Sequence, residues 1–249
     1  MDSTVGRSGA PVESAVGPAV AAVIFDLDGV LVDTQIWWRD VRDAWAAGHG
    51  ITWRDEDEHR TMGANTRQWA RMMAERAGLD AGHDAAIART ILDALVERYR
   101  LEGAPRIPGA VEAVRKIAGR YPVAVASGSH RRLIEVALES IGLDEVVRTI
   151  VSADDVPHGK PAPDVYREAA RRLGVEPAAC LVVEDSLNGL QAAQAAGMAA
   201  VLVPNAKVPP DPRAAGLADV VLDRLEELDP AMIGSPMRPL PRRSRGISS

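Results

Sequence analysis

Short apolar runs recur along the chain in a pattern that predicts a buried sheet. The runs are rich in β-branched side chains and are apolar at both odd and even positions. A strand that is apolar on both faces is typical of a parallel sheet covered on both sides. We expect strands at residues 21–25, 123–126, 149–151, 181–183, 200–203 and 220–222, of which the run at 149–151 is the weakest.

Segments with helical periodicity separate most of these runs. In residues 131–141, apolar side chains recur at spacings of three and four residues, which places them on one face of a helix. Similar patterns occupy residues 109–120, 162–173 and 187–196. Strands that alternate with helices imply a doubly wound α/β fold, in which a parallel sheet lies between two helical layers.

The segment from residue 35 to residue 106 interrupts this alternation. It shows no convincing strand, it contains helical patterns such as residues 85–101, and it holds all five Trp residues. It leads into Gly-Ala-Pro-Arg-Ile-Pro at residues 103–108, a composition typical of a linker. We therefore expect an inserted all-helical cap domain of roughly 70 residues after the first strand.

The chain is expected to divide into a core, a cap and two unstructured ends. Residues 1–18 and 230–249 lack periodicity and are predicted to be a disordered leader and a disordered basic tail. The α/β core is predicted at residues 19–34 and 107–229, and the helical cap at residues 35–106. The tail could contact a phosphate-rich partner, although a solvated chain end is the favoured interpretation.

The composition argues against several classes of protein. The chain has 249 residues and a net charge of −6, from 29 Lys and Arg against 35 Asp and Glu, which argues against a dedicated nucleic-acid binder. No apolar run approaches the ~20 residues that a membrane-spanning helix needs. A single cysteine, Cys180, permits no intramolecular disulfide. We expect a cytoplasmic monomer that acts on a small molecule and contacts neither nucleic acid nor membrane.

Chemically active side chains follow three of the predicted strands. Asp26 and Asp28 follow the first run, Ser127 ends the second, and Glu184 and Asp185 follow the run at 181–183. Ligands of open α/β sheets bind beyond the carboxyl ends of the strands, so these side chains are expected to meet. Taken singly they have simpler interpretations, such as a solvated turn or a helix cap, but their joint occurrence favours a shared functional site.

Carboxylates gathered at one edge require a compensating positive charge, because like charges raise one another's pKa. Mg²⁺ suits a site with a few carboxylates and a phosphate ligand. Lys160 lies in a Gly-Lys-Pro segment and is one of only three lysines in the chain, so its place is informative. With Mg²⁺, Lys160 and a phosphate dianion present the site stays anionic, so one carboxyl group should hold a proton and can act as a general acid.

Four segments together resemble a known family. Residues 25–34 begin Phe-Asp-Leu-Asp-Gly, residues 126–129 read Ala-Ser-Gly-Ser, residues 159–164 begin Gly-Lys-Pro, and residues 182–186 read Val-Val-Glu-Asp-Ser. They are similar to the four motifs of the haloacid dehalogenase (HAD) superfamily of phosphotransferases, and Asn-Gly-Leu-Gln-Ala-Ala at 188–193 is typical of its β-phosphoglucomutase-like branch. The resemblance implies a Rossmann-like core with a helical cap inserted after the first motif.

The resemblance also implies roles for individual residues. Asp26 would be the nucleophile that forms an aspartyl-phosphate, and Asp28 would protonate the leaving oxygen and then activate water. The implied phosphate-binding residues are Ser127, Gly128 and Lys160. The implied Mg²⁺ ligands are Asp26, Asp28 through its backbone carbonyl, Glu184 and Asp185. Further candidates for contact with the substrate are Arg67, Ser129 and Arg131.

The sequence narrows the reaction within this family. Dehalogenases lack a general acid at the position of Asp28, and phosphonate-cleaving relatives need a cap Lys, of which residues 35–108 contain none. Sugar-phosphate mutases of this branch usually carry a His early in the cap, where Trp38 stands here, and a Lys farther along the cap. Hydrolysis of a small phosphorylated metabolite is therefore favoured, with a β-phosphoglucomutase-type mutase and an inactive phosphometabolite-binding module as alternatives.

The five Trp residues of the predicted cap allow two interpretations. They fill the core of a small helical domain, or one or two of them line the substrate pocket with Met62, Arg67 and His49. Helical caps of this type open and close over the active site, and the expected hinges are residues 33–35 and 103–108.

Overall fold

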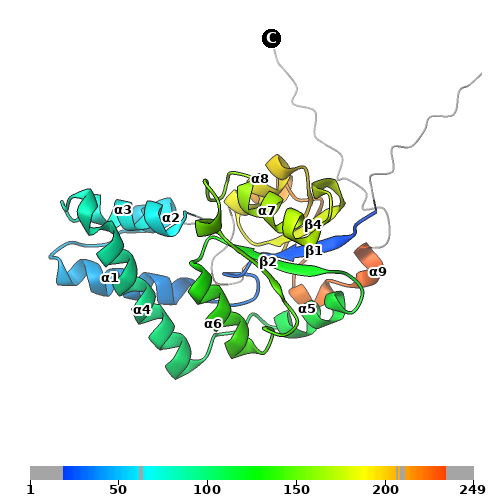
Figure 1. Ribbon diagram of the computed structural model, residues 1–249, viewed down its shortest axis with the longest axis horizontal. Helices are drawn as coiled ribbons and strands as arrows, with labels where there is room; N and C mark the ends of the chain where they lie inside the picture. The colour runs from blue at the N-terminus through cyan, green and yellow to red at the C-terminus, as the bar shows by residue number, and fades with distance from the viewer. Residues whose placement is uncertain (1–18, 62–63, 206, 208–210, 234–249) are drawn as a thin grey trace, which may run out of the picture.

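A six-stranded parallel sheet forms the centre of the structure, a computed structural model that describes residues 19–61, 64–205, 207 and 211–233 (Figure 1). The strands are β1 (Ala22–Phe25), β2 (Val123–Ser127), β3 (Thr149–Ser152), β4 (Cys180–Glu184), β5 (Ala199–Leu202) and β6 (Val220–Val221). Every strand that the sequence predicts is present, and each end lies within one residue of its expected position. The fold is the expected doubly wound α/β fold.

The strand order β3-β2-β1-β4-β5-β6 decides where a ligand can bind. The chain runs outward from β1 through β2 to β3, and then crosses to β4 on the other side of β1. At such a reversal the loops that follow adjacent strands diverge to opposite faces of the sheet and leave a crevice at its carboxyl edge. The loops after β1, β2 and β4 border this crevice.

Helices cover both faces of the sheet, and alternate residues of each strand pack against opposite layers. Val23 and Phe25 belong to the apolar cluster that includes α5 and α6, whereas Ala22 and Ile24 belong to the cluster formed with α7 and α8. Figure 1 shows the two pairs of helices on either side of the strands. The core helices are α5 (Ala110–Ala118), α6 (Arg131–Ile141), α7 (Asp164–Leu173) and α8 (Leu187–Ala196).

Four helices between β1 and β2 gather beside the sheet rather than on either face (Figure 1). They are α1 (Gln35–Gly48), α2 (Asp55–Thr61), α3 (Thr66–Arg76) and α4 (Asp84–Glu102). Four of the five Trp side chains in this part of the chain are buried and support the core interpretation, whereas Trp38 is half-buried. The Trp37 ring, for example, meets Tyr99 edge-on at 5.2 Å between centroids.

The two chain segments that join these helices to the sheet run side by side. The backbone N–H of Asp33 donates to the carbonyl of Pro105 at 2.7 Å, and that of Ile107 donates to the carbonyl of Leu31 at 3.1 Å. The helices also touch the core at a distance from these segments. Thr66 Oγ1 donates to Asp154 Oδ2 at 2.6 Å, just after β3.

Residues 230–233, which were predicted to belong to a disordered tail, are ordered in the structure. A short helix, α9 (Pro230–Ile233), follows Asp229, and its Ile233 is buried in the core. Asp229 Oδ1 accepts a hydrogen bond from the N–H of Ala231 at 2.7 Å, which caps the helix, and proline is well tolerated at a first helical position. The expected leader and the rest of the tail lie outside the described residues.

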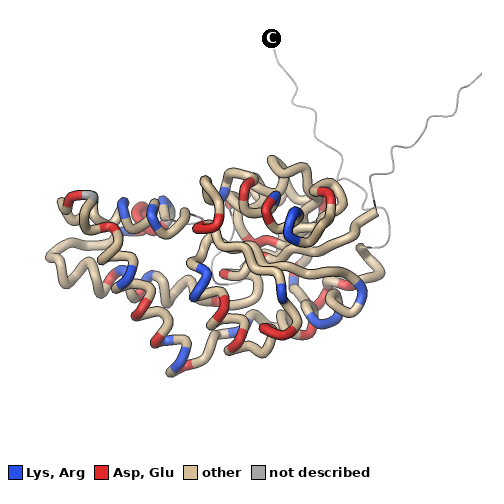
Figure 2. Tube along the Cα trace, viewed as in Figure 1, with Lys and Arg blue, Asp and Glu red and all other residues tan. Residues whose placement is uncertain are grey.

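Short 3₁₀ helices complete the described chain. They are η1 (Ala81–His83), η2 (Ala153–Asp155), η3 (Pro177–Ala179), η4 (Ala214–Gly216) and η5 (Leu225–Glu227). In the part of the chain that the structure describes, none of the helices has both the length and the apolar character needed to cross a membrane. Figure 2 shows Lys and Arg interspersed with Asp and Glu along both the helices that cover the sheet and helices α1 to α4.

Candidate active site

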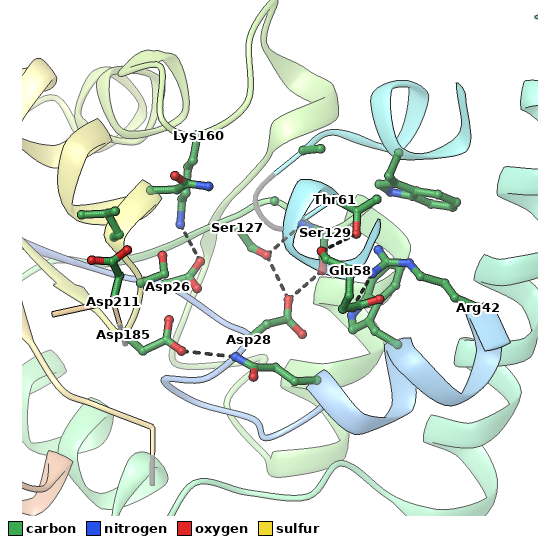
Figure 3. Close-up of a pocket in the computed structure, with 18 of the residues that line it drawn as sticks. Asp26, Asp28, Arg42, Glu58, Thr61, Ser127, Ser129, Lys160, Asp185 and Asp211 are labelled. Carbon is green, nitrogen blue, oxygen red and sulfur yellow. Dashed lines mark hydrogen bonds and ion pairs between the residues drawn. The ribbon is translucent and has the colours of Figure 1, made fainter. Parts of the chain in front are cut away.

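A pocket of about 560 Å³ lies between the carboxyl edge of the sheet and helices α1 to α3. The core lines it with Asp26, Asp28, Ser127, Gly128, Ser129, Lys160 and Asp185, among others. The sequence predicted that these residues share one site, and they do share one pocket. Figure 3 shows the carboxylates and Lys160 converging on it from separate segments of the core.

Gly29 allows the loop after β1 to lie directly against Asp185 in the loop after β4. Gly29 has φ +92°, a backbone conformation that side-chain-bearing residues rarely adopt. A Cβ atom at Gly29 would lie 2.0 Å from Oδ2 of Asp185, so only glycine lets the β4 loop approach the β1 loop this closely. The Asp26 N–H donates to the carbonyl of Val183 at 2.9 Å and continues the sheet to the site.

Lys160 bridges two carboxylates in the interior. Its Nζ donates to Asp26 Oδ1 and to Glu184 Oε1, each at 2.7 Å, and only 7% of the residue is exposed. The ammonium group also lies 4.8 Å from the centre of the Tyr166 ring. Burial alone would lower the pKa of Lys160, but the two carboxylates raise it above its ordinary value, so the lysine stays charged.

Glu184 is fully buried and both of its oxygens are occupied. Oε1 accepts from Lys160 and from the Tyr166 hydroxyl, the latter at 2.7 Å. Oε2 accepts from the N–H groups of Asp185 and Ser186 and from the Ser186 hydroxyl, at 2.9–3.0 Å. Burial would raise the pKa of Glu184, but Lys160 and these donors hold it below its ordinary value. Glu184 is therefore an ionised anchor for Lys160.

The carboxylates of Asp26, Glu184 and Asp185 form a cluster whose oxygens approach within 4.8 Å of one another. Burial raises the pKa of Asp26 to about 7, and it raises the pKa of Asp185 well above its ordinary value, with the neighbouring carboxylates adding to both shifts. These groups resist ionising together unless a cation offsets their charge. An all-oxygen donor set of this kind fits a hard divalent cation such as Mg²⁺.

Asp28 lies on the side of Asp26 that faces helices α1 to α3, which we call the cap side of the pocket, and it is held by three hydroxyl groups. Ser129 Oγ donates to its Oδ2 at 2.7 Å and Ser127 Oγ donates to the same oxygen at 3.4 Å, while Thr34 Oγ1 donates to Oδ1. The Ser127 hydroxyl also accepts from the Ser129 N–H at 3.0 Å. Ser129, a candidate for contact with the substrate, lines the pocket and also holds Asp28.

The cap side of the pocket contains residues that the sequence analysis missed. Arg42 and Glu58 form an ion pair at 2.6 Å there, beside Trp38 and Trp69. A signal was available, because Arg42 follows Trp38 by four residues and therefore lies on the same face of α1. Other missed positions are Thr34, Gln35 and Tyr166, of which Gln35 donates to Asp185 Oδ2 at 3.4 Å.

Two arginines predicted to contact the substrate lie elsewhere. Arg131 Nη2 is paired with Asp155 at 2.5 Å and donates to the carbonyl of Ile150 at 3.1 Å, so it is engaged away from the pocket. Arg67 is exposed on α3 and does not line the pocket. His49 stacks on Trp45 at 3.9 Å between ring centres instead of lining the pocket. Met62 lies outside the described residues.

The chain is similar to known proteins in both sequence and structure. A family model described as haloacid dehalogenase-like hydrolase matches residues 20–197. The fructose-1-phosphate phosphatase YqaB of Escherichia coli is 37% identical over 188 residues, which cover 73% of this chain and 95% of that protein. Hexitol phosphatase B of the same organism is 36% identical over 218 residues, which cover 84% and 94% respectively.

A solved structure shares the fold. The β-phosphoglucomutase from Clostridium difficile superposes with a TM-score of 0.75 at 21% identity, and the match covers 88% of this chain and 97% of that one. The resemblance to the HAD superfamily and to the β-phosphoglucomutase-like fold is thereby confirmed. Because the matched family model spans most of the chain and includes all of the motif segments at the pocket, the chain belongs to the haloacid dehalogenase-like hydrolases.

Proposed function

We propose that this protein is a Mg²⁺-dependent phosphatase that hydrolyses a small phosphorylated sugar or polyol through an aspartyl-phosphate intermediate. The observation that carries the proposal is the convergence of Asp26, Asp28, Lys160 and Asp185 in one pocket at the carboxyl edge of the sheet. The names of the two similar E. coli enzymes, a fructose-1-phosphate phosphatase and a hexitol phosphatase, support the substrate class.

In the first chemical step, a carboxylate oxygen of Asp26 attacks phosphorus and the bond to the leaving oxygen breaks. Lys160 holds Oδ1 of Asp26 at 2.7 Å, which fixes the carboxylate and leaves Oδ2 for the attack. Asp28 gives its proton to the leaving oxygen. Asp28 is kept in place by hydrogen bonds from the hydroxyl groups of Thr34, Ser127 and Ser129.

In the second step, water hydrolyses the aspartyl-phosphate and regenerates the free enzyme. Asp28, now ionised, takes a proton from a water molecule whose oxygen attacks phosphorus, and the bond to Asp26 breaks to give inorganic phosphate. Ser127, Gly128 and Lys160 bind the phosphoryl oxygens in both steps. One carboxyl group thus serves as acid and then as base.

Asp26 and Asp185 are the side chains that would hold Mg²⁺, together with the backbone carbonyl of Asp28. The ion, when bound, offsets the charge of the carboxylates and of the phosphoryl oxygens. We assign Glu184 a different role from the one the sequence suggested, because both of its oxygens already accept hydrogen bonds. It keeps Lys160 in place and adds negative charge beside the metal site.

We also propose that residues 35–106 act as a cap that closes over the pocket. Its two connections to the core lie side by side at residues 33–35 and 103–108, which suits a hinge. Closure would bring Trp38 and Arg42 over the bound substrate and exclude water. Hydrolysis is favoured over mutase chemistry because residues 35–108 contain no Lys and Trp38 replaces the His that mutases of this branch usually carry.

A substrate screen with matched variants tests the proposal. Purified protein is assayed for phosphate release from phosphorylated sugars, polyols, nucleotides and glycolate, with Mg²⁺ and with EDTA. Turnover should require Mg²⁺ and should be abolished in Asp26→Asn, whereas Asp144→Asn, an exposed aspartate remote from the pocket, should match the wild type. Equal rates for Asp26→Asn and wild type would rule out the assigned nucleophile. Conversion of β-glucose 1-phosphate to glucose 6-phosphate in the presence of a bisphosphate primer would instead identify a mutase.

A further inference from the structure

Arg42 reaches from α1 into the cap side of the pocket, although only 5% of the residue is exposed. The centre of its guanidinium group lies 4.7 Å from the Trp38 ring and 5.8 Å from the Trp69 ring. Its Nε is buried and has no hydrogen-bond partner among the described residues. This N–H is closed off from the pocket, so a ligand can be contacted only by the terminal nitrogens of the guanidinium group of this pocket-lining arginine.

The charge of Arg42 is already balanced by Glu58. Arg42 Nη1 donates to Glu58 Oε1 at 2.6 Å, and Trp53 Nε1 donates to Glu58 Oε2 at 2.8 Å, which fixes the carboxylate beside the arginine. The pair therefore presents a hydrogen-bond donor to the pocket without a net positive charge. Thr61 lies in the same part of the pocket lining (Figure 3), and its hydroxyl proton is donated to the backbone carbonyl of Glu58 at 2.8 Å.

A hydroxyl group matches this arrangement better than an anion does. A terminal N–H of the Arg42 guanidinium can donate to a hydroxyl oxygen, and the Thr61 oxygen, whose own proton is engaged, can accept from a hydroxyl. An anion could use the donor but would meet the acceptor and the Glu58 carboxylate unfavourably.

The charges around the whole pocket lead to the same conclusion. Each of the three cationic side chains that line it is paired with a carboxylate: Arg42 with Glu58, Lys160 with Asp26, and Arg213 with Asp211. The divalent cation of the proposed reaction can compensate the phosphate that is transferred. No lining cation within the described residues is left to compensate a second phosphate at the far end of a substrate.

We propose that Arg42, held by Glu58, recognises the end of the substrate remote from the transferred phosphate by donating a terminal guanidinium N–H to an uncharged hydroxyl group. The inference rests on the proposed phosphatase function and narrows its substrate class. The enzyme hydrolyses monophosphates of hydroxylated carbon chains and discriminates against bisphosphates that have the same carbon chain. Glu58 sets this selectivity by cancelling a charge that would otherwise attract a second phosphate.

The substrate preference of the wild type is the first test. Fructose 1-phosphate and fructose 1,6-bisphosphate share a carbon skeleton and differ by the distal phosphate, and p-nitrophenyl phosphate reports the core chemistry with a leaving group that needs little recognition. We expect kcat/KM to favour the monophosphate by about tenfold or more. Equal or better use of the bisphosphate would overturn the inference and leave the phosphatase standing. No Mg²⁺-dependent turnover of any of the three compounds would refute both.

Variants of the pair supply the second test. In Glu58→Gln the charge of Arg42 is no longer cancelled, so the ratio of kcat/KM for bisphosphate to that for monophosphate should rise about tenfold. This ratio is measured on one preparation, so a partly misfolded sample does not affect it. An unchanged ratio would refute the role of Glu58.

Arg42→Met keeps the apolar bulk of the side chain and removes the donor. Its loss of kcat/KM should be about tenfold larger for fructose 1-phosphate than for p-nitrophenyl phosphate. Equal losses on both substrates would mean that Arg42 is only structural. Arg39→Met is the matched control, because Arg39 lies on the same helix, is exposed and pairs with Asp55 outside the pocket. Arg39→Met should leave kcat/KM unchanged for fructose 1-phosphate, fructose 1,6-bisphosphate and p-nitrophenyl phosphate.

Discussion

Glu184 offers the sharpest test of how the site is held together, because its carboxylate accepts hydrogen bonds and donates none. Lys160 and Tyr166 donate to Oε1, and three donors from Asp185 and Ser186 converge on Oε2. The substitution Glu184→Gln keeps the shape but replaces one acceptor oxygen with an NH₂ group. In one orientation the NH₂ faces the Lys160 ammonium, and in the other it faces three donors.

The magnitude follows from the burial of the pair. Removing one partner of a buried ion pair costs about 3–5 kcal/mol, and the lower end of this range is expected here because Lys160 keeps Asp26 as a second partner. For a chain of this size that corresponds to a fall in Tm of roughly 6–20 °C. Tyr166→Phe removes a single donor to the same oxygen and should cost about 1 kcal/mol. Glu145→Gln, the same change at an exposed glutamate, should stay within about 0.5 kcal/mol of the wild type.

Thermal and urea unfolding, followed by circular dichroism, measure these differences. The order of destabilisation should be Glu184→Gln, then Tyr166→Phe, then Glu145→Gln. If Glu184→Gln unfolded with the wild-type midpoint, the carboxylate would not be the charged anchor of Lys160, and the reasoning about the buried pair would be wrong. Phosphatase activity should fall with Glu184→Gln in the fraction that remains folded, because Lys160 then has only Asp26 to hold it.

Three further changes probe the metal site, the β1 loop and the cap. Burial raises the folded-state pKa of Asp26 to about 7, above its ordinary 3.8, so the metal-free protein should lose stability as the pH rises through that range. Mg²⁺ binds the ionised carboxylates, so the increase in Tm that it produces should grow from about pH 5.5 to about pH 8, and an increase that shrank instead would contradict this assignment. Gly29→Ala would force Asp185 away and should lower kcat/KM about 100-fold. Gly50 also has a positive φ but has open space around it, so Gly50→Ala should affect stability alone. Equal activities of the two variants would show that the contact between residue 29 and Asp185 is unimportant. Thr66→Val removes a hydrogen bond between cap and core and should lower kcat/KM about threefold to tenfold with little change in Tm; unchanged kinetics would argue against cap closure through this contact.

The core end of the site was accessible from the sequence because it depends on strand geometry. Buried runs identify the strands, and parallel strands deliver the residues that follow them to one edge of a sheet. Asp26, Asp28, Ser127 and Asp185 could therefore be assigned to one site without a structure. The spacing of these residues along the chain is irrelevant, since the sheet supplies the proximity.

The cap side was not accessible in the same way, because its contacts depend on how short helices meet. Arg42 belongs to a helix rich in charged residues, where an arginine is expected to face solvent. It is buried because α2 brings Glu58 against it, and nothing in the local pattern of either helix specifies that meeting. Arg131 was assigned to the substrate because it follows the second motif, but Asp155 after β3 pairs with it.

The two sides of the pocket handle charge in opposite ways, and the difference matches their proposed tasks. On the core side, burial and then the neighbouring carboxylates raise the pKa values of Asp26 and Asp185, so a cation and a phosphate can enter as a matched pair. On the cap side, Glu58 already balances Arg42, so binding there selects through hydrogen bonds rather than net charge. A change of substrate that leaves the chemistry intact therefore requires changes on the cap side alone, and altering the charge balance at Glu58 is the smallest such change.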